Sequence, residues 1–177
     1  MRKVGLLLLL AALLAVPAMG QDEYPKAEVF GGFSYVRSGG VNYPGWAASV
    51  AANFHKNVGV VGDFAGFYKS VDVGLPEKVK ASAYEFMFGP RLSVRGEKAT
   101  GFVHVLFGGI NGRAGYQGVS ASLTYFGMAF GGGVDVNVSK HVAIRVAQLD
   151  VVTGRIEGTW ARDFRYEGGV VFKFGGK

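Results

Sequence analysis

The stretch Phe164-Arg165-Tyr166-Glu167-Gly168-Gly169-Val170-Val171-Phe172-Lys173-Phe174 decides the fold of this chain. Tyr166, Val170, Phe172 and Phe174 alternate with a polar set that contains Arg165, Glu167 and Lys173. A period of two residues predicts a β-strand with one apolar face and one polar face. Such a strand fits the last strand of a closed barrel whose apolar face meets lipid, and it fits the edge of a soluble β-sandwich equally well.

The length and composition indicate one domain. The chain has 177 residues, 29 of them glycine, no cysteine, and 14% aromatic residues. This length suffices for one closed core, and the absence of cysteine excludes disulfides and thiolate metal sites. The formal charge of +6 comes from scattered Lys and Arg residues without a basic run, so we expect no nucleic-acid partner.

Residues 1–20 are predicted to be a signal peptide. Arg2 and Lys3 precede an apolar segment from Gly5 to Val16, and Ala18-Met19-Gly20 supplies the small residues that a signal peptidase reads. Cleavage before Gln21 would leave a single domain of residues 21–177. The alternative is an uncleaved membrane anchor, although the apolar run is shorter than the roughly 20 residues that a spanning helix needs.

Seven further segments of the chain alternate in the same way. Each is long enough to cross a bilayer as a tilted strand. In the seventh, Gln148 and Asp150 break the alternation, which predicts a β-bulge or emergence from the membrane. In the fourth, Pro90 suggests an edge or a bulge. The predicted strands are Lys26–Arg37, Gly45–His55, Val58–Lys69, Lys80–Val94, Thr100–Ile110, Leu123–Val138 and His141–Thr153.

The predicted connections alternate in length. His55–Asn57, Arg95–Ala99 and Ser139-Lys140 are short, whereas Ser38–Pro44, Ser70–Val79, Asn111–Ser122 and Gly154–Trp160 are longer. With the N-terminus in the periplasm, all short connections fall at the periplasmic end, as in outer-membrane barrels. We therefore predict an all-β fold, an eight-stranded antiparallel up-and-down transmembrane β-barrel in the cell outer membrane.

In hydrocarbon every backbone N–H and C=O group needs an internal partner, so the sheet must close. Eight strands enclose a lumen that side chains just fill. Gly127, Ala129, Gly131 and Gly133 lie on one inward face, where they would make room for bulky inward side chains. Those side chains are Phe30, Phe67, Met87 and Phe102.

The inward faces also carry charges of both signs. Because an unpaired buried charge costs several kcal/mol, we predict a network of ion pairs in the lumen, with Arg165 and Lys173 as further inward cations. Alternatively, residues near strand ends lie beyond the membrane, in water. The predicted network contains Glu28, Asp63, Glu85, Arg91, His104, Asp135, Arg145 and Glu167.

Aromatic residues gather toward strand ends on the outward faces. Amphipathic rings prefer the membrane interface, so we predict interfacial positions for Tyr35, Trp46, Tyr68 and Tyr84. In a soluble sandwich the same rings would instead be core residues.

The chain resembles the small eight-stranded outer-membrane β-barrel proteins of the OmpA/OmpX type over residues 26–174. Four stretches carry the resemblance: Glu28-Val29-Phe30-Gly31-Gly32-Phe33-Ser34-Tyr35, Phe88-Gly89-Pro90-Arg91, Phe130-Gly131-Gly132-Gly133-Val134-Asp135, and Ile144-Arg145-Val146 followed by Gln148 and Asp150. The resemblance implies a barrel inserted among outer-membrane lipids and lipopolysaccharide by periplasmic chaperones and the barrel-assembly machinery. It implies no shared biochemical activity and no oligomeric state.

The C-terminal strand is similar to the assembly signal of that family. Glu167, Gly169, Phe172 and Phe174 occupy the polar, glycine and two aromatic positions of the signal. The tail Gly175-Gly176-Lys177 departs from it, because the family signal usually ends at its aromatic residue.

No arrangement of residues predicts an enzyme, a metal site or a cofactor. His55 and His141 lie at turns, and no two histidines share a strand. His104 faces inward without a nucleophile or carboxylate at local spacing, so a hydrogen-bonding role is expected. Asp150 and Glu157 are placed near the outer end, where single carboxylates could contact cations or lipopolysaccharide.

The function expected is therefore a non-catalytic barrel with a plugged lumen and a structural or surface-interaction role. The alternatives are a narrow pore, a soluble lipocalin-like ligand-binding barrel and a lipid-modifying enzyme. Cations that flank the outer connections could contact lipopolysaccharide phosphates, or could be ordinary solvated charges. These cations are Lys69, Lys78, Lys80, Arg113, Arg155 and Arg162.

Overall fold

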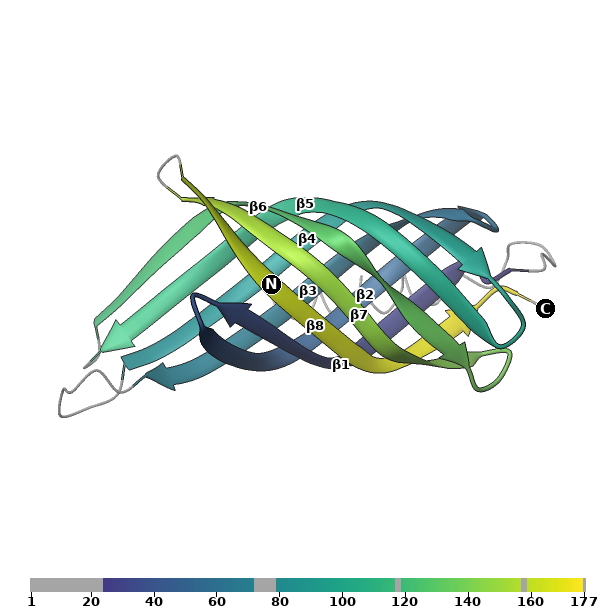
Figure 1. Cartoon of the computed structure of the whole chain (residues 1–177), viewed down its shortest axis with the longest axis horizontal. Coiled ribbons are helices and arrows are strands. Elements are labelled where there is room, and N and C mark those ends of the chain that lie inside the picture. Colours follow the sequence, from purple (N-terminus) through teal and green to yellow (C-terminus); the bar gives the residue numbers. More distant parts are fainter. Residues whose placement is uncertain (1–23, 72–78, 117–118, 157–158, 177) are drawn as a thin grey trace, which may run out of the picture.

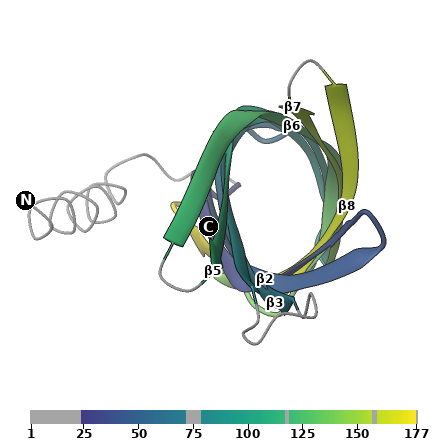
Figure 2. The ribbon, with the colours of Figure 1, turned by 90° about the vertical axis from the view of Figure 1, so that its left-hand side faces the viewer.

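The computed structural model describes residues 24–71, 79–116, 119–156 and 159–176, which form a closed antiparallel barrel (Figures 1 and 2). Each strand pairs with the next, and β8 pairs with β1, so the eight-stranded fold predicted from the sequence is confirmed. The predicted signal peptide lies outside the described residues. The strands are β1 (Ala27–Ser38), β2 (Val41–His55), β3 (Val58–Val71), β4 (Val79–Arg95), β5 (Ala99–Tyr116), β6 (Val119–Asn137), β7 (Val142–Ile156) and β8 (Thr159–Phe174).

The alternation along each strand separates a lumen face from an outer face. Phe30 and Phe67 are buried inside the barrel, whereas Phe64 and Phe88 are 51% and 70% exposed on its outer surface. A lipocalin-like barrel has the opposite arrangement, with its apolar face inward, so that alternative is wrong. A closed sheet with an apolar outer surface is suited to hydrocarbon. Among the described residues, no helix is long and apolar enough to cross a membrane.

Three of the predicted longer connections are wrong, because most of their residues belong to strands. Gly39 and Gly40 alone connect β1 to β2, with φ angles of 54° and 80° that suit a type I′ turn. In the segment Asn111–Ser122, Asn111 pairs with Thr124 and Arg113 with Ser122. Gly154–Trp160 likewise lies mostly in β7 and β8. The sequence predicted loops here because Gly, Ser and Asn favour turns. A strand that extends beyond the bilayer needs no apolar face, however, so these residues can still pair with a neighbouring strand.

The barrel has two distinct ends, which are named here for what they carry. The termini end holds Lys26 and Phe174, whose backbone groups pair, and it lies at the right of Figure 1, where the C-terminus is marked. The hairpin end holds the Gly39-Gly40 turn and the far ends of β5 and β6. Most of the predicted connection Ser70–Val79 lies outside the described residues.

The break in alternation at Gln148 and Asp150 corresponds to a β-bulge in β7, the first of the two explanations that the sequence allowed. The pairing of β7 with β8 shifts between Arg145 and Gln148, and the pairing with β6 shifts between Val134 and Asp135. Arg145 and Gln148, three residues apart, therefore both point into the lumen. Pro90 does not mark an edge strand, because the closed barrel has no edge. It marks an interruption in the pairing of β4 with β5. Pairing of β4 with β5 runs to Phe88 and resumes at Arg91.

The small residues of β6 make room for the large inward side chains of nearby strands, as predicted. A Cβ atom on Gly133 would lie 2.8 Å from Cζ of Phe102, and one on Gly127 would lie 3.1 Å from Cε of Met87. Both distances are too short for an unshifted neighbour, so glycine at these positions allows the lumen to be filled.

Candidate functional site

The lumen is the candidate functional site, because it collects the buried charges of the molecule. All eight residues of the predicted network point into it and are buried. They lie in two clusters along the barrel axis, defined below. They belong to seven different strands. The eight residues are Glu28, Asp63, Glu85, Arg91, His104, Asp135, Arg145 and Glu167.

The first, or acid-rich, cluster is built around Arg165, whose side chain is 0% exposed. Its Nη1 lies 2.8 Å from Asp63 Oδ1 and 2.9 Å from Glu85 Oε2. Its Nη2 lies 2.8 Å from Asp150 Oδ2, and its Nε 3.3 Å from Glu167 Oε1. Because these carboxylates belong to β3, β4, β7 and β8, one guanidinium group bridges the lumen from wall to wall.

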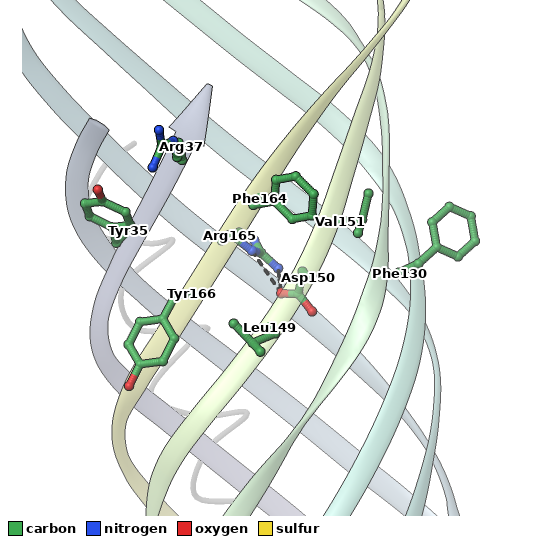
Figure 3. Close-up of a pocket in the computed structure, with 9 residues that line it drawn as sticks. All are labelled: Tyr35, Arg37, Phe130, Leu149, Asp150, Val151, Phe164, Arg165 and Tyr166. Atoms are coloured by element: carbon green, nitrogen blue, oxygen red, sulfur yellow. Dashed lines mark hydrogen bonds and ion pairs between the residues drawn. The ribbon is translucent and has the colours of Figure 1, made fainter. Parts of the chain in front are cut away.

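Neutral and imidazole groups complete the acid-rich cluster. His104 Nε2 lies 2.8 Å from Asp150 Oδ1, and Gln148 Nε2 donates to Asp150 Oδ2 at 2.8 Å. Ser34 Oγ donates to Glu167 Oε1 at 3.3 Å. Figure 3 shows the Asp150 and Arg165 side chains facing each other from β7 and β8. Asp150 is thus held by three different partners.

The second, or base-rich, cluster reverses the ratio of charges. It lies toward the termini end and contains two carboxylates, three guanidinium groups and one ammonium group. Arg145 Nε and Nη2 donate to the two oxygens of Asp135 at 2.8 and 3.2 Å. Arg91 Nη1 lies 2.9 Å from Glu28 Oε2, and Arg95 donates to the other oxygen of Glu28. The members are Glu28, Asp135, Arg91, Arg95, Arg145 and Lys173.

Aromatic rings of the lumen stabilise two of these cations. The Arg91 guanidinium lies 4.1 Å from the centre of the Phe102 ring. The Arg145 guanidinium lies 4.3 Å from the centre of Phe30 and 4.5 Å from that of Phe102. Cation–π contacts of this kind contribute about 2 kcal/mol when they are desolvated. The bulky inward aromatics therefore pair with charge as well as fill space.

Gln148 connects the two clusters. Its Oε1 accepts a hydrogen bond from Arg145 Nη1 at 2.7 Å, while its Nε2 donates to Asp150. One amide thereby joins a cation of the base-rich cluster to an anion of the acid-rich cluster. With the ion pair between Arg91 and Asp135 at 3.6 Å, these contacts connect the guanidinium and carboxylate groups of both clusters, whereas Lys173 bonds to Asn137.

The hydrogen bonding of the two clusters is not equally complete. In the base-rich cluster, Arg91 Nε and Nη2 and Arg95 Nη2 are buried and have no hydrogen-bond partner among the residues that the structure describes. Arg91 Nη2 is 3.6 Å from Asp135, which is longer than a hydrogen bond. Glu28 Oε2 is close to Arg91 but is not aligned for a hydrogen bond. In the acid-rich cluster, Glu167 Oε2 is the one fully buried atom that has no hydrogen-bond partner among the described residues.

The sequence prediction missed three members of the network: Arg95, Gln148 and Asp150. Arg95 was assigned to a turn, yet it is the last residue of β4 and donates to Glu28. Asp150 was expected near the outer end, yet it is 2% exposed in the lumen and bonded to Arg165. Gln148 was not assigned a role. The available signal was the break in alternation, because a bulge after Arg145 returns positions 148 and 150 to the lumen face.

The four predicted interfacial aromatics lie outside the lumen network. Trp46 Nε1 lies 3.3 Å from the Tyr68 hydroxyl, and the Tyr68 and Tyr84 rings meet edge to face at 5.9 Å. These three residues form a continuous aromatic cluster across β2, β3 and β4. Tyr35, on β1, pairs instead with Tyr166 of β8. Their depth in the bilayer stays a prediction.

The four residues of the predicted assembly signal have different surroundings. Glu167 is buried in the lumen, whereas Phe172 and Phe174 are 49% and 45% exposed on the outer face. Gly169 faces Gly32 across the β1–β8 seam, where a Cβ atom would lie 2.6 Å from the Gly32 Cα. Gly169 thus has a packing reason to be glycine that is independent of any signal.

Comparisons with known proteins identify the fold. The sequence matches no protein-family model, and it matches no curated protein sequence. The attachment invasion locus protein Ail of Yersinia pestis is 18% identical, with a TM-score of 0.58 over 87% of this chain and 100% of that one. Neisserial surface protein A is 12% identical, with a TM-score of 0.60 over 88% and 100%. The N-terminal β-barrel domain of Pseudomonas aeruginosa OprF is 14% identical, with a TM-score of 0.61 over 85% and 99%.

The chain therefore has the fold of the small eight-stranded outer-membrane barrels, as the resemblance implied. This fold, together with the exposed apolar residues on the outer face, identifies an integral protein of the outer membrane.

Proposed function

We propose that this barrel is non-catalytic, that its lumen is plugged, and that it serves a structural or surface-interaction role in the envelope. The observation that carries the proposal is the position of Arg165. Its guanidinium reaches carboxylates of β3 and β4 as well as those of β7 and β8, and no part of the side chain is exposed.

A conducting pathway would have to cross this cluster. An ion in transit would displace Arg165 from carboxylates at 2.8 to 2.9 Å, which would leave buried charges without partners. The interior of an eight-stranded barrel is also just wide enough for its own side chains. The geometry therefore favours a closed barrel over the narrow pore, the main alternative.

Single-channel recording on the purified, refolded barrel in planar bilayers tests this proposal. We expect no steady conductance from the unmodified protein. Arg165→Ala removes the bridging side chain, so among single variants it is the one most expected to conduct. Arg113→Ala, at the exposed hairpin end, is its matched control. Large and steady conductance from the unmodified protein would overturn the plugged lumen.

For the surface role, the proposed partner is lipopolysaccharide, contacted at the hairpin end. Arg37, Arg113, Arg155 and Arg162 are exposed there, on four different strands. Ail, which shares the fold, has been crystallised with the heparin analogue sucrose octasulfate. We expect the refolded barrel to bind lipopolysaccharide micelles, and Arg155→Gln with Arg162→Gln to weaken that binding. Lys56→Gln, at the termini end, should leave it unchanged.

For assembly, the proposed partners are the periplasmic chaperones and the barrel-assembly machinery. Phe172 and Phe174 occupy the aromatic positions of the signal and project from the finished barrel. Phe174→Ala should accumulate unfolded protein in cells while the purified variant still refolds in detergent. Equal loss of refolding in detergent would indicate a packing defect instead.

A further inference from the structure

A cavity of about 330 Å³ lies at the termini end, where the base-rich cluster reaches solvent. Its walls come from the β4–β5 turn, the β6–β7 turn and the end of β8. The polar and charged lining is Arg95, Glu97, Thr100, Asn137, Ser139, Lys140 and Lys173. Three cations therefore face one carboxylate, Glu97, which is exposed at the rim.

The two innermost cations are incompletely neutralised. Arg95 shares Glu28 with Arg91, so one carboxylate serves two guanidinium groups. Arg95 Nη2 is buried, and within the described part of the chain it has no hydrogen-bond partner. Lys173 Nζ donates to the amide oxygen of Asn137, a neutral acceptor, and among the described residues it forms no ion pair with a carboxylate.

Two hydroxyl groups also line the cavity and can donate hydrogen bonds. Ser139 Oγ accepts hydrogen bonds from the backbone N–H groups of His141 and Val142, so its own O–H remains available to donate. Thr100, 2% exposed, contributes a second hydroxyl to the lining. The Asn137 amide group is already used, because Nδ2 donates to the carbonyl oxygens of Gly96 and Glu97.

We propose that this cavity binds a small oxyanion with two negative charges, of which inorganic phosphate and a small phosphate monoester are the simplest forms. Guanidinium and ammonium groups with hydroxyl donors are the usual partners of phosphate oxygens. A cation would meet the excess positive charge of Arg95, Lys140 and Lys173, and a neutral solute would leave it uncompensated. The site shares Arg95 and Lys173 with the base-rich cluster at the mouth of the lumen, but it depends neither on a plugged lumen nor on the proposed surface role.

Backbone amide NMR of the refolded barrel in a zwitterionic detergent tests the site. Titration with sodium phosphate should give saturable shifts at Gly96, Thr100 and Ser139, with sodium chloride at matched ionic strength as the reference. Glycerol phosphate in a separate titration distinguishes a monoester from the free ion. Tighter binding of glycerol phosphate would assign the cavity to small phosphorylated solutes, and equal or weaker binding would assign it to the free anion.

Three variants make the test specific. Arg95→Gln with Lys173→Gln should weaken phosphate binding by about tenfold or more, the effect of losing charge-assisted hydrogen bonds. Lys140→Gln, at the exposed rim, should weaken it about threefold and avoids any effect on the interior. Lys98→Gln removes a neighbouring exposed charge that does not line the cavity, and should leave binding unchanged.

Folding of each variant is checked by its gel shift between unheated and heated samples. If the double variant fails to fold, Lys140→Gln against Lys98→Gln still decides the question. Shifts that rise linearly without saturation would overturn the proposal, as would shifts spread over all exposed cations. Equal weakening by Lys98→Gln and Lys140→Gln would do the same.

Discussion

The two charge clusters of the lumen differ in which charge sits at the centre. In the acid-rich cluster a single Arg165 guanidinium is surrounded by four carboxylates. In the base-rich cluster the carboxylates Glu28 and Asp135 are each shared between guanidinium groups. A guanidinium offers five donors in a fixed plane, so it can satisfy several oxygens at once, whereas one carboxylate cannot satisfy every N–H group of two arginines.

This difference explains which end of the lumen is open to a ligand. The acid-rich cluster uses its donors internally, and Glu167 Oε2 is its one fully buried atom without a partner in the part of the chain that the structure describes. The base-rich cluster leaves buried guanidinium N–H groups unused on Arg91 and Arg95, and it borders the cavity at the termini end. The comparison predicts that the acid-rich cluster contributes stability, and that the base-rich cluster keeps capacity for binding.

Arg165→Met should have the largest effect on stability. It leaves Asp63, Glu85, Asp150 and Glu167 without their shared cation, and breaking a buried ion pair by removing one partner costs about 3 to 5 kcal/mol. We expect the free energy of unfolding to fall by that amount. Urea unfolding of the refolded barrel, followed by the gel shift between folded and unfolded forms, measures it.

Two controls separate charge from packing at Arg165. Arg113→Met, at an exposed position, should change stability by less than about 0.5 kcal/mol. Adding Asp63→Asn and Glu85→Gln to Arg165→Met should recover part of the loss, because fewer charges are then unpaired. No recovery would mean that the guanidinium acts mainly by filling space.

Arg145→Met should have the next largest effect, about 2 to 4 kcal/mol in the free energy of unfolding. It removes two hydrogen bonds to Asp135, the bond to Gln148 and the contacts with two aromatic rings. Asp135 still has Arg91 Nη2 at 3.6 Å, so its charge is not left alone. The same unfolding measurement applies, and a loss as large as that of Arg165→Met would contradict the contrast between the clusters.

Gly169→Ala should lower the free energy of unfolding by about 1 to 3 kcal/mol, the cost of overpacking. The substitution lies where the two clusters meet. Gly169 pairs with Arg145 of β7 and lies two residues after Glu167, so a shift of the seam displaces both clusters. Gly31→Ala on the opposite strand of the seam is the matched control, since a Cβ atom there would meet nothing within 4 Å. If both variants unfold at the same urea concentration, the close approach to Gly32 does not limit stability.

The sequence predicted the strands and the lumen faces well because both depend on local alternation. A period of two holds along the strands except at the bulge of β7, and it placed Glu28, Asp63 and Arg165 on the correct face before any pairing was known. The ends of the strands were predicted less well. Gly-rich segments such as Asn111–Ser122 favour turns locally, and their incorporation into β5 and β6 depends on pairing with a neighbour.

The members of each cluster could not be predicted from local sequence. Arg165 meets Asp63 across 102 positions in the chain, a contact set by closure of the barrel and by its strand stagger. Asp150 depends on the bulge after Arg145, which changes the face of every later residue in β7. The break in alternation was visible in the sequence, but whether it marked a bulge or the membrane surface was not.

His104→Gln should have the smallest effect of this series, about 1 kcal/mol in the free energy of unfolding. His104 Nε2 bonds to Asp150, and Asp150 retains Arg165 and Gln148 when the imidazole is lost. A glutamine amide can also donate a hydrogen bond to this carboxylate. The size of the loss therefore tests whether Arg165 is the sole cation of the acid-rich cluster. A loss near that of Arg165→Met would make the imidazole a second cation. A small loss, with a coupling of at least about 0.5 kcal/mol to Gln148→Ala, would show two neutral donors sharing one carboxylate.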